Sequence, residues 1–210
     1  RQMIRLETLT ERELQRIRGQ SVSMIFQEPM TSLNPVFTCG NQVSETLRRH
    51  LGISKKAARE RVLELFNEVS LPESSRIYRS YPHELSGGQK QRVMIAMAIS
   101  CKPSLLIADE PTTALDVSVQ KTILDLLKEL QQKMKMSILF ITHDLGLISR
   151  FADRVLVMYQ GKIVEEGEVT RVFDHPQHPY TQGLIACRPP LDVRLRRLPT
   201  VEDYISSPQL

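Results

Sequence analysis

The stretch from Leu85 to Glu110 (LSGGQKQRVMIAMAISCKPSLLIADE) constrains the fold of this 210-residue chain more than any other. It opens with the signals of a helix start, because Ser86 is a favourable N-cap and Gln89 stands three residues later, as in a capping box. Gly87 and Gly88 leave the first backbone N–H groups of that helix uncovered. Such a helix end attracts anions, phosphate above all.

The same stretch ends in the pattern of a buried strand followed by two acidic residues. The apolar run from Leu105 to Ala108 suits a strand that is buried on both faces, and it stops abruptly at Asp109 and Glu110. An isolated acidic pair after a strand usually belongs to a solvated loop. In a parallel α/β sheet, however, ligands bind at the carboxyl ends of the strands, and P-loop enzymes hold Mg²⁺ there with an aspartate.

Taken together and in this order, LSGGQKQR, a helix and LLIADEPTTALD closely resemble the signature and Walker B motifs of the ATP-binding cassette (ABC) ATPases. The resemblance extends over nearly the whole chain. It implies that Ser86, Gly87 and Gly88 contact the γ-phosphate of an ATP held by the opposite subunit, and that Gln89 belongs to the same nucleotide-binding motif. It also implies that Asp109 supports Mg²⁺ and that Glu110 is the general base for the attacking water.

Two further motifs match the same family at strand ends. A strand from Val22 to Phe26 ends at Gln27, and MIFQEPMTSLNP is similar to the Q-loop of cassettes that serve peptide importers. The resemblance implies that Gln27 reaches the Mg²⁺ and the attacking water and links the ATP site to the membrane subunit. A predicted buried strand from Ser137 to Thr142 ends in His143, which matches the H-loop and would contact the γ-phosphate and hold Glu110 and water in line.

Helical patterns fill the chain between these motifs. Apolar residues recur at helical spacing on one face of a predicted helix that Ser54 caps: Ala58, Val62, Leu65, Phe66 and Val69. Thr10 and Glu13 predict a capping box for a helix of about ten residues that stops near Gly19. Ala114-Leu115-Asp116 resembles the D-loop, so Asp116 is expected to cross the dimer interface, before another amphipathic helix that extends to Met134. Residues 154–165 are predicted as a hairpin of the core sheet, followed by a short helix to Asp174.

The resemblance predicts an α/β fold of the P-loop NTPase (RecA-like) type, with a parallel core sheet and an inserted α-helical subdomain. Four segments are expected: residues 1–39 as a remnant of the ATP-binding core with the Q-loop, 40–100 as the helical subdomain that ends in the signature helix, 101–174 as the core with Walker B, D-loop and H-loop, and 175–210 as a peptide-importer-type extension.

The extension is predicted from HPQHPYTQGLIA, which runs from His175 to Ala186 and resembles the carboxyl-terminal part of ATPases from oligopeptide and dipeptide importers and their nickel and glutathione-conjugate relatives. Composition alone would allow His175 and His178 to suggest a metal site. Some relatives carry an iron-sulfur cluster here, but Cys187 is the only cysteine in this region, so no cluster is expected. The tail from Arg188 to Leu210 is predicted to be extended.

Composition narrows the location and the partners. The net charge is +4, but Lys and Arg are interspersed with Asp and Glu rather than gathered in a basic patch. We therefore expect an ordinary solvated surface and no nucleic-acid partner. Three widely spaced cysteines suit a reducing compartment. Because no apolar run approaches the length of a membrane span and no signal peptide is present, membrane attachment is expected through a partner. The predicted location is the cytoplasmic face of the bacterial inner membrane.

The G-x-x-x-x-G-K-[ST] pattern of a Walker A loop does not occur in this sequence, and the Gly161-Lys162 pair lacks the preceding glycine. That loop would supply the backbone and the lysine that hold the β- and γ-phosphates. We therefore expect an ABC ATPase domain truncated at its amino terminus, with a naturally short reading frame or one half of a tandem protein as the alternative.

The expected function is ATP-driven import of peptides or similar small solutes, with ATP and Mg²⁺ as cofactors. The expected partners are a second ABC ATPase subunit or domain in a head-to-tail dimer, integral membrane permease subunits and, indirectly, a solute-binding protein. One alternative is a non-catalytic partner that donates only its signature helix to another subunit's ATP. A second is a soluble ABC ATPase that works on DNA or ribosomes, although the Q-loop sequence and HPQHPY argue against it.

Overall fold

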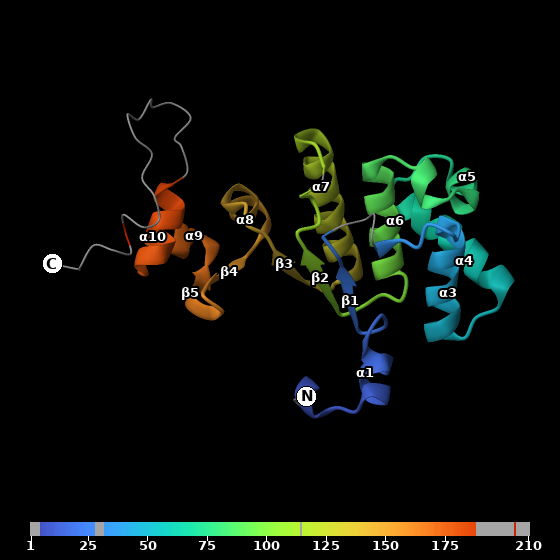
Figure 1. Ribbon diagram of the computed structural model, residues 1–210, viewed down its shortest axis with the longest axis horizontal. Coiled ribbons are helices and arrows are strands. Elements are labelled where there is room, and N and C mark those ends of the chain that lie inside the picture. Colours follow the sequence, from blue (N-terminus) through green and yellow to red (C-terminus); the bar gives the residue numbers. More distant parts are fainter. Residues whose placement is uncertain (1–4, 28–31, 114, 188–203, 205–210) are drawn as a thin grey trace. The chain divides into compact units, whose positions relative to one another are not determined.

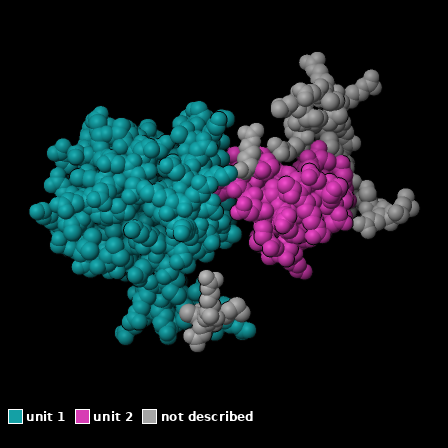
Figure 2. Space-filling model, turned by 180° about the vertical axis from the view of Figure 1, so that it is seen from behind, with its two compact units in different colours: residues 1–141 teal, residues 142–210 magenta. Residues whose placement is uncertain are grey.

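A computed structural model describes residues 5–27, 32–113, 115–187 and Tyr204 (Figure 1). The chain forms two compact units, residues 1–141 and 142–210, which Figure 2 colours teal and magenta. No helix in the described ranges is both long enough and apolar enough to cross a lipid bilayer.

The first unit is built on three parallel strands in the order β1 (Val22–Ile25), β2 (Leu105–Asp109) and β3 (Ser137–Ile141). The central strand β2 aligns its first residue with the first residue of each neighbour. Parallel strands need long crossovers, and here a group of helices connects β1 to β2 while α7 (Val117–Met134) connects β2 to β3 (Figure 1). This is the predicted parallel α/β sheet with an inserted helical part.

Burial differs between the strands of this sheet. In β2, Leu106 and Ala108 on one face are fully buried, whereas Leu105 and Ile107 on the other face are partly buried, so the predicted burial on both faces is complete on one face only. The prediction of a buried strand at β3 is wrong, because Leu139 and Ile141 are each 44% exposed. The physical reason is that β3 is an edge strand of the sheet formed by the described residues, where it pairs with β2.

The inserted helical part consists of α3 (Cys39–Leu51), α4 (Lys55–Glu68), α5 (Ser74–Arg79), the short η2 (Pro82–Glu84) and α6 (Gly87–Ile99). Its helices share one apolar interior, in which the predicted stripe of α4 is fully buried: Ala58, Val62, Leu65 and Phe66. Ser54 caps α4 as predicted, since its hydroxyl accepts the N–H of Ala57. Local capping and the spacing of apolar residues were therefore sufficient to place this helix.

Close contact at the start of α3 depends on a glycine. A Cβ atom added to Gly40 would lie 2.2 Å from the Tyr78 ring of α5. Next to it, burial raises the pKa of the Cys39 thiol to about 11. Cys39 therefore stays protonated near neutral pH and packs as a small apolar side chain rather than acting as a nucleophile.

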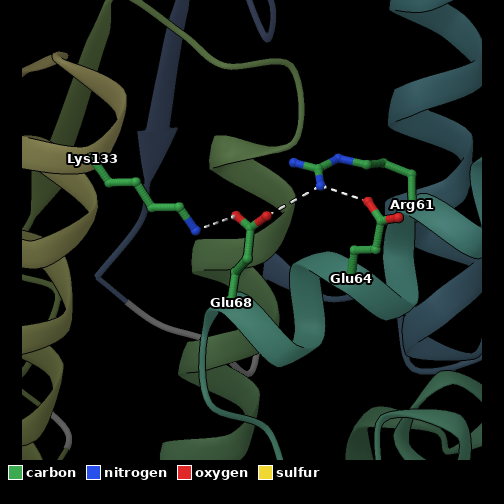
Figure 3. A network of polar contacts seen from close by, with 4 residues as sticks. All are labelled: Arg61, Glu64, Glu68 and Lys133. Carbon is green, nitrogen blue, oxygen red and sulfur yellow. Dashed lines mark hydrogen bonds and ion pairs between the residues drawn. The ribbon is translucent and has the colours of Figure 1, made fainter.

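A chain of ion pairs connects α4 to α7 within the first unit (Figure 3). Arg61 contacts Glu64 at 2.8 Å and Glu68 at 3.1 Å, and Lys133 of α7 lies 3.9 Å from the other oxygen of Glu68. Burial lowers the pKa of Arg61, but its hydrogen bonds to Glu64 and Glu68 outweigh burial and raise that pKa overall. These contacts hold the helical part against the helix that follows β2.

The first described segment contains a 3-10 turn, η1 (Leu6–Thr8), and α1 (Glu11–Ile17). The capping box between Thr10 and Glu13 is confirmed. The helix has seven residues, fewer than predicted, because the chain leaves the helical conformation at Arg18 and takes a positive φ of 80° at Gly19.

The second unit contains α8 (Leu145–Phe151), β4 (Arg154–Tyr159), β5 (Lys162–Glu168), α9 (Val169–Asp174) and α10 (Pro179–Ala186). β4 and β5 form the predicted hairpin, and positive φ angles at Gln160 and Gly161 make the tight turn. The hairpin is a separate two-stranded sheet, so its assignment to the core sheet was wrong for the described strands. Its apolar face packs on α9 through Val155, Val169 and Val172.

The HPQHPY segment folds around a carboxylate of β5. Glu165 accepts the backbone N–H of Gln177 through one oxygen at 2.8 Å and that of His178 through the other at 3.0 Å. His178 then caps α10, because its Nδ1 accepts the N–H of Tyr180 at 3.1 Å. The ring of Tyr180 stacks on that of Tyr159. The motif therefore has a structural explanation, and no cluster of metal-ligating side chains occurs among the described residues.

This anchor is expected to weaken in acid. Burial raises the pKa of Glu165, but the nearby Thr181 hydroxyl and the hydrogen bonds from the N–H groups of Gln177 and His178 outweigh burial, so the pKa lies below the ordinary 4.5. The stabilisation is thus fully present above 4.5 and is lost as the pH falls through the lowered pKa of the folded state. Following the amide proton shifts of Gln177 and His178 in an acid titration should show one shared midpoint below 4.5. Glu165→Gln should remove that transition, whereas Glu166→Gln should leave it; a transition that survives Glu165→Gln contradicts the assignment.

Candidate functional site

Two predicted site residues meet at the carboxyl edge of the three-stranded sheet. Gln27 follows β1 and Glu110 follows β2, and the Gln27 Nε2 donates a hydrogen bond of 2.7 Å to the Glu110 Oε2. The two residues are 83 positions apart in the chain. They meet because β1 and β2 are adjacent and parallel, so that both strands end at the same edge. Asp109, the last residue of β2, lies at this edge as well and is partly buried.

The backbone of Glu110 is held in an unusual conformation. Its φ is +44°, in the left-handed region that non-glycine residues seldom adopt. Its N–H donates to the carbonyl oxygen of Ile141 at the end of β3, at 3.0 Å. The chain thus turns sharply out of β2 while the sheet still holds the Glu110 amide, which fixes the point from which the carboxylate extends.

Thr113 is a polar contact of this site that the sequence motifs did not single out. Its hydroxyl donates to the Glu110 Oε2 at 2.9 Å, and its N–H donates to the Glu110 carbonyl oxygen at 3.3 Å. The second bond closes a turn that brings the two side chains together. A sequence signal for this contact does exist. Thr113 stands three residues after Glu110, directly beyond a strand end, and a turn of that length can direct the threonine hydroxyl back to the first residue of the turn.

The predicted anion-binding helix start is confirmed as a capped helix N-terminus. In α6, the Ser86 hydroxyl accepts the Gln89 N–H at 3.3 Å, and the Gln89 side chain accepts the Ser86 N–H at 3.1 Å. Ser86 and Gly87 are exposed. The first N–H groups of α6 therefore have a defined direction and are accessible from solvent, which is the arrangement that favours a phosphate.

Gly88 lets α6 lie close to the start of α7, while Gly87 faces the same segment at ordinary contact distance. A Cβ atom at Gly88 would lie 3.0 Å from Val119 Cγ1, and one at Gly87 would lie 3.5 Å from Leu115 Cδ2. The signature segment and the D-loop segment, both in the first unit, are consequently packed side by side.

Asp116 is the N-cap of α7. Its Oδ1 accepts the Ser118 hydroxyl at 2.6 Å and the Val119 N–H at 2.9 Å, and these bonds, that from Ser118 above all, lower the pKa of Asp116. Gln120 holds the preceding loop by donating to the carbonyl oxygens of Thr112 and Leu115. Asp116 thus has a clear structural function, and its predicted place at a dimer interface stays a prediction.

Other predicted residues belong to the second unit or lie outside the described residues. His143 belongs to the second unit, where it is exposed, and its predicted contacts with Glu110 and the γ-phosphate stay predictions. Residues 28–31 of the Q-loop sequence, Ala114 of the D-loop, and all of the tail except Tyr204 lie outside the described residues.

The oxygen atoms at the carboxyl edge of the sheet are of the type that binds Mg²⁺. The Asp109 carboxylate and the amide oxygen of Gln27 are hard oxygen donors, which Mg²⁺ prefers. No group of three or more His, Cys, Asp or Glu side chains within the described ranges could hold a metal by itself. Because Mg²⁺ is usually bound by one or two carboxylates together with substrate phosphates and water, these residues fit a magnesium ion that arrives with a nucleotide.

Comparison with known proteins gives two family matches. Residues 3–113 match the family described as ABC transporter. Residues 164–209 match the oligopeptide/dipeptide transporter C-terminal region.

Individual relatives agree with these matches. The glutathione import ATP-binding protein GsiA of Salmonella typhimurium is 56% identical over 191 residues, which are 91% of this chain and 31% of that protein. A putative peptide import ATP-binding protein of Brucella melitensis is 52% identical over 203 residues, or 97% of this chain and 61% of that protein. The chain thus spans less than two thirds of the length of these relatives.

Solved structures show the same fold. The dimeric post-hydrolysis state of the ATP-binding cassette MJ0796, bound to ADP and Pi, superposes with a TM-score of 0.70 at 32% identity, over 79% of this chain and 70% of that chain. The structure of cbiO1 from Clostridium perfringens, part of the complex cbiONQ, gives a TM-score of 0.66 at 29% identity.

Proposed function

Because the chain belongs to the ABC transporter family, we propose that the protein from which it comes hydrolyses ATP to energise the uptake of peptides or related small solutes. The match to the oligopeptide/dipeptide C-terminal region and the similarity to glutathione and peptide import proteins support this solute class. The proposed location is the cytoplasmic face of the membrane, with attachment through integral membrane subunits.

The observation that carries the proposal is the Glu110 carboxylate at the strand edge, hydrogen-bonded by Gln27. A carboxylate in this position can accept a proton from a water molecule as the water oxygen attacks the γ-phosphorus of ATP. The bond from that phosphorus to the bridging oxygen breaks, and its electron pair leaves with ADP. Mg²⁺, when bound through Asp109 and Gln27, would neutralise charge on the phosphates.

The capped start of α6 supports a second part of the proposal, a head-to-tail dimer with another ATPase subunit or domain. Its uncovered N–H groups and helix dipole suit the γ-phosphate of an ATP that the partner holds. The cassette MJ0796 forms dimers. His143 would act from the second unit on the γ-phosphate of this chain's own site, and Asp116 would lie at the interface.

The absence of a Walker A motif from these 210 residues leaves a second candidate function open. Without the lysine and backbone cradle of that motif, the β- and γ-phosphates lack most of their binding groups. The alternative is then a non-catalytic subunit that donates only α6 to the ATP of its partner. Measuring ATP hydrolysis by the intact protein distinguishes the two functions, because only the first requires hydrolysis at this chain's own site.

A surface suited to the membrane subunit follows the Q-loop in the chain. The Gln42 side chain accepts the N–H of Asn34 and donates to the carbonyl oxygens of Asn34 and Phe37. Val36 and Phe37 are 69% and 53% exposed on the loop that these bonds hold. Two large apolar side chains on a fixed, exposed loop favour contact with a partner protein, and we propose the permease as that partner.

Uptake by the reconstituted transporter tests the proposal. Lipid vesicles that contain the intact protein and its membrane subunits are expected to transport labelled glutathione or a short peptide across the membrane. Transport should require ATP and Mg²⁺ on the side of the membrane where the ATPase subunit lies. Phe37→Glu should reduce co-purification with the membrane subunits and uptake together, whereas Leu51→Glu, at another exposed apolar position, should not. Failure to co-purify with any membrane subunit would contradict the proposal and favour a soluble ABC ATPase.

A further inference from the structure

We propose that Thr113 is a positioning residue for Glu110, which keeps the carboxylate in place when Gln27 leaves it. The inference rests on the proposed ATPase function. It concerns a residue of the loop between β2 and α7 that contacts the proposed base directly.

The geometry places two donors on one oxygen. Gln27 Nε2 and the Thr113 hydroxyl donate to the same Oε2 of Glu110, at 2.7 and 2.9 Å. One donor comes from a distant segment, 83 residues away, and the other from a turn of the same loop. Two directed bonds to one oxygen restrict rotation of the carboxylate much more than one bond does.

The Thr113 donor is itself well held. Threonine is branched at Cβ, which restricts its χ1 angle, and the Thr113 N–H is bonded to the Glu110 carbonyl oxygen. Gln120 of α7 holds the loop on both sides of Thr113, through the carbonyl oxygens of Thr112 and Leu115. The hydroxyl therefore approaches the carboxylate from a fixed position.

The Gln27 and Thr113 donors differ in whether their bonds to Glu110 can persist during turnover. The amide oxygen of Gln27 is the proposed Mg²⁺ ligand, and if the side chain turns to place that oxygen on the ion, the Nε2 bond to Glu110 is lost. The bond from Thr113 depends only on the local turn and can persist through that change. Since misplacing a catalytic group by about 1 Å can cost about 10²-fold in rate, a second donor that stays in place preserves the base during turnover.

The test uses Thr113→Val, which keeps the shape but removes the donor, and Thr113→Ser, which keeps the donor. In the intact protein, Thr113→Val should lower kcat for ATP hydrolysis about 10-fold, as expected for the loss of one hydrogen bond to a charged group. The KM for ATP should change by less than about twofold, since the carboxylate contributes to the chemical step rather than to binding. Thr113→Ser should recover most of the parental kcat.

A readout independent of hydrolysis comes from the Glu110→Gln background. There, Thr113→Val should change neither ATP affinity nor ATP-dependent dimerisation, because a positioning residue acts through the base. A loss of either, a parental kcat in Thr113→Val, or a Thr113→Ser variant as slow as Thr113→Val would overturn the inference. If Glu110→Gln left hydrolysis intact, both the proposed role of Glu110 and the inference about Thr113 would be wrong. If Glu110→Gln stopped hydrolysis and Thr113→Val did not lower it, only the inference about Thr113 would be wrong.

Discussion

Replacing Glu110 with glutamine is expected to lower the ATP hydrolysis rate of the intact protein by about 10²- to 10⁴-fold, the usual contribution of a positioned general base. Glutamine has nearly the same shape, and its amide oxygen can still accept the hydrogen bonds that Gln27 and Thr113 donate to Glu110. It cannot take a proton from water near neutral pH. ATP affinity should therefore stay close to that of the parent, and the ATP-bound dimer should accumulate.

Steady-state hydrolysis and equilibrium ATP binding, measured on the same preparation, check this expectation. Glu129→Gln is a matched control, because it removes the same charge from an exposed position of α7 and should leave both quantities unchanged. Hydrolysis at the parental rate in Glu110→Gln would exclude Glu110 as the base. A loss of ATP binding would instead indicate that the carboxylate holds the nucleotide or its metal.

Replacing Ser86 with arginine is expected to lower hydrolysis by about 10²-fold or more, on the scale of removing a group that stabilises transferred charge. The long side chain would stand at the exposed start of α6, where the uncovered N–H groups are proposed to meet the partner's γ-phosphate. Arginine also removes the cap oxygen, which typically contributes about 0.5 to 2 kcal/mol to helix stability. ATP-dependent dimerisation in the Glu110→Gln background should be lost as well.

Ser86→Thr provides the control, because threonine keeps a cap oxygen that can accept the Gln89 N–H. It should dimerise and hydrolyse ATP nearly as the parent does. Thermal unfolding of both variants separates the capping effect from the effect at the phosphate. If Ser86→Arg dimerised normally with ATP, α6 would not face the nucleotide of the partner.

Features that depend on neighbours in the chain could be predicted from the sequence. The capping boxes at Thr10 and Ser86 and the apolar stripe of α4 were predicted correctly. The end of β2 at the acidic pair was predicted correctly too. Each of these is determined by residues within a single helix or a single strand, so hydrogen-bonding capacity and the spacing of apolar side chains are sufficient.

Tertiary structure alone decided the contacts between distant or turning segments. The bond from Gln27 to Glu110 depends on the register of two parallel strands 83 residues apart, and no local pattern carries that register. The bond from Thr113 depends on a turn that begins at Glu110 with a positive φ angle. Glutamate seldom adopts such an angle, so the residue type gives no sign of this conformation. The exposure of β3 and the separation of the hairpin from the core sheet depend on which strands pair, because a strand's burial is set by its neighbours and not by its own composition.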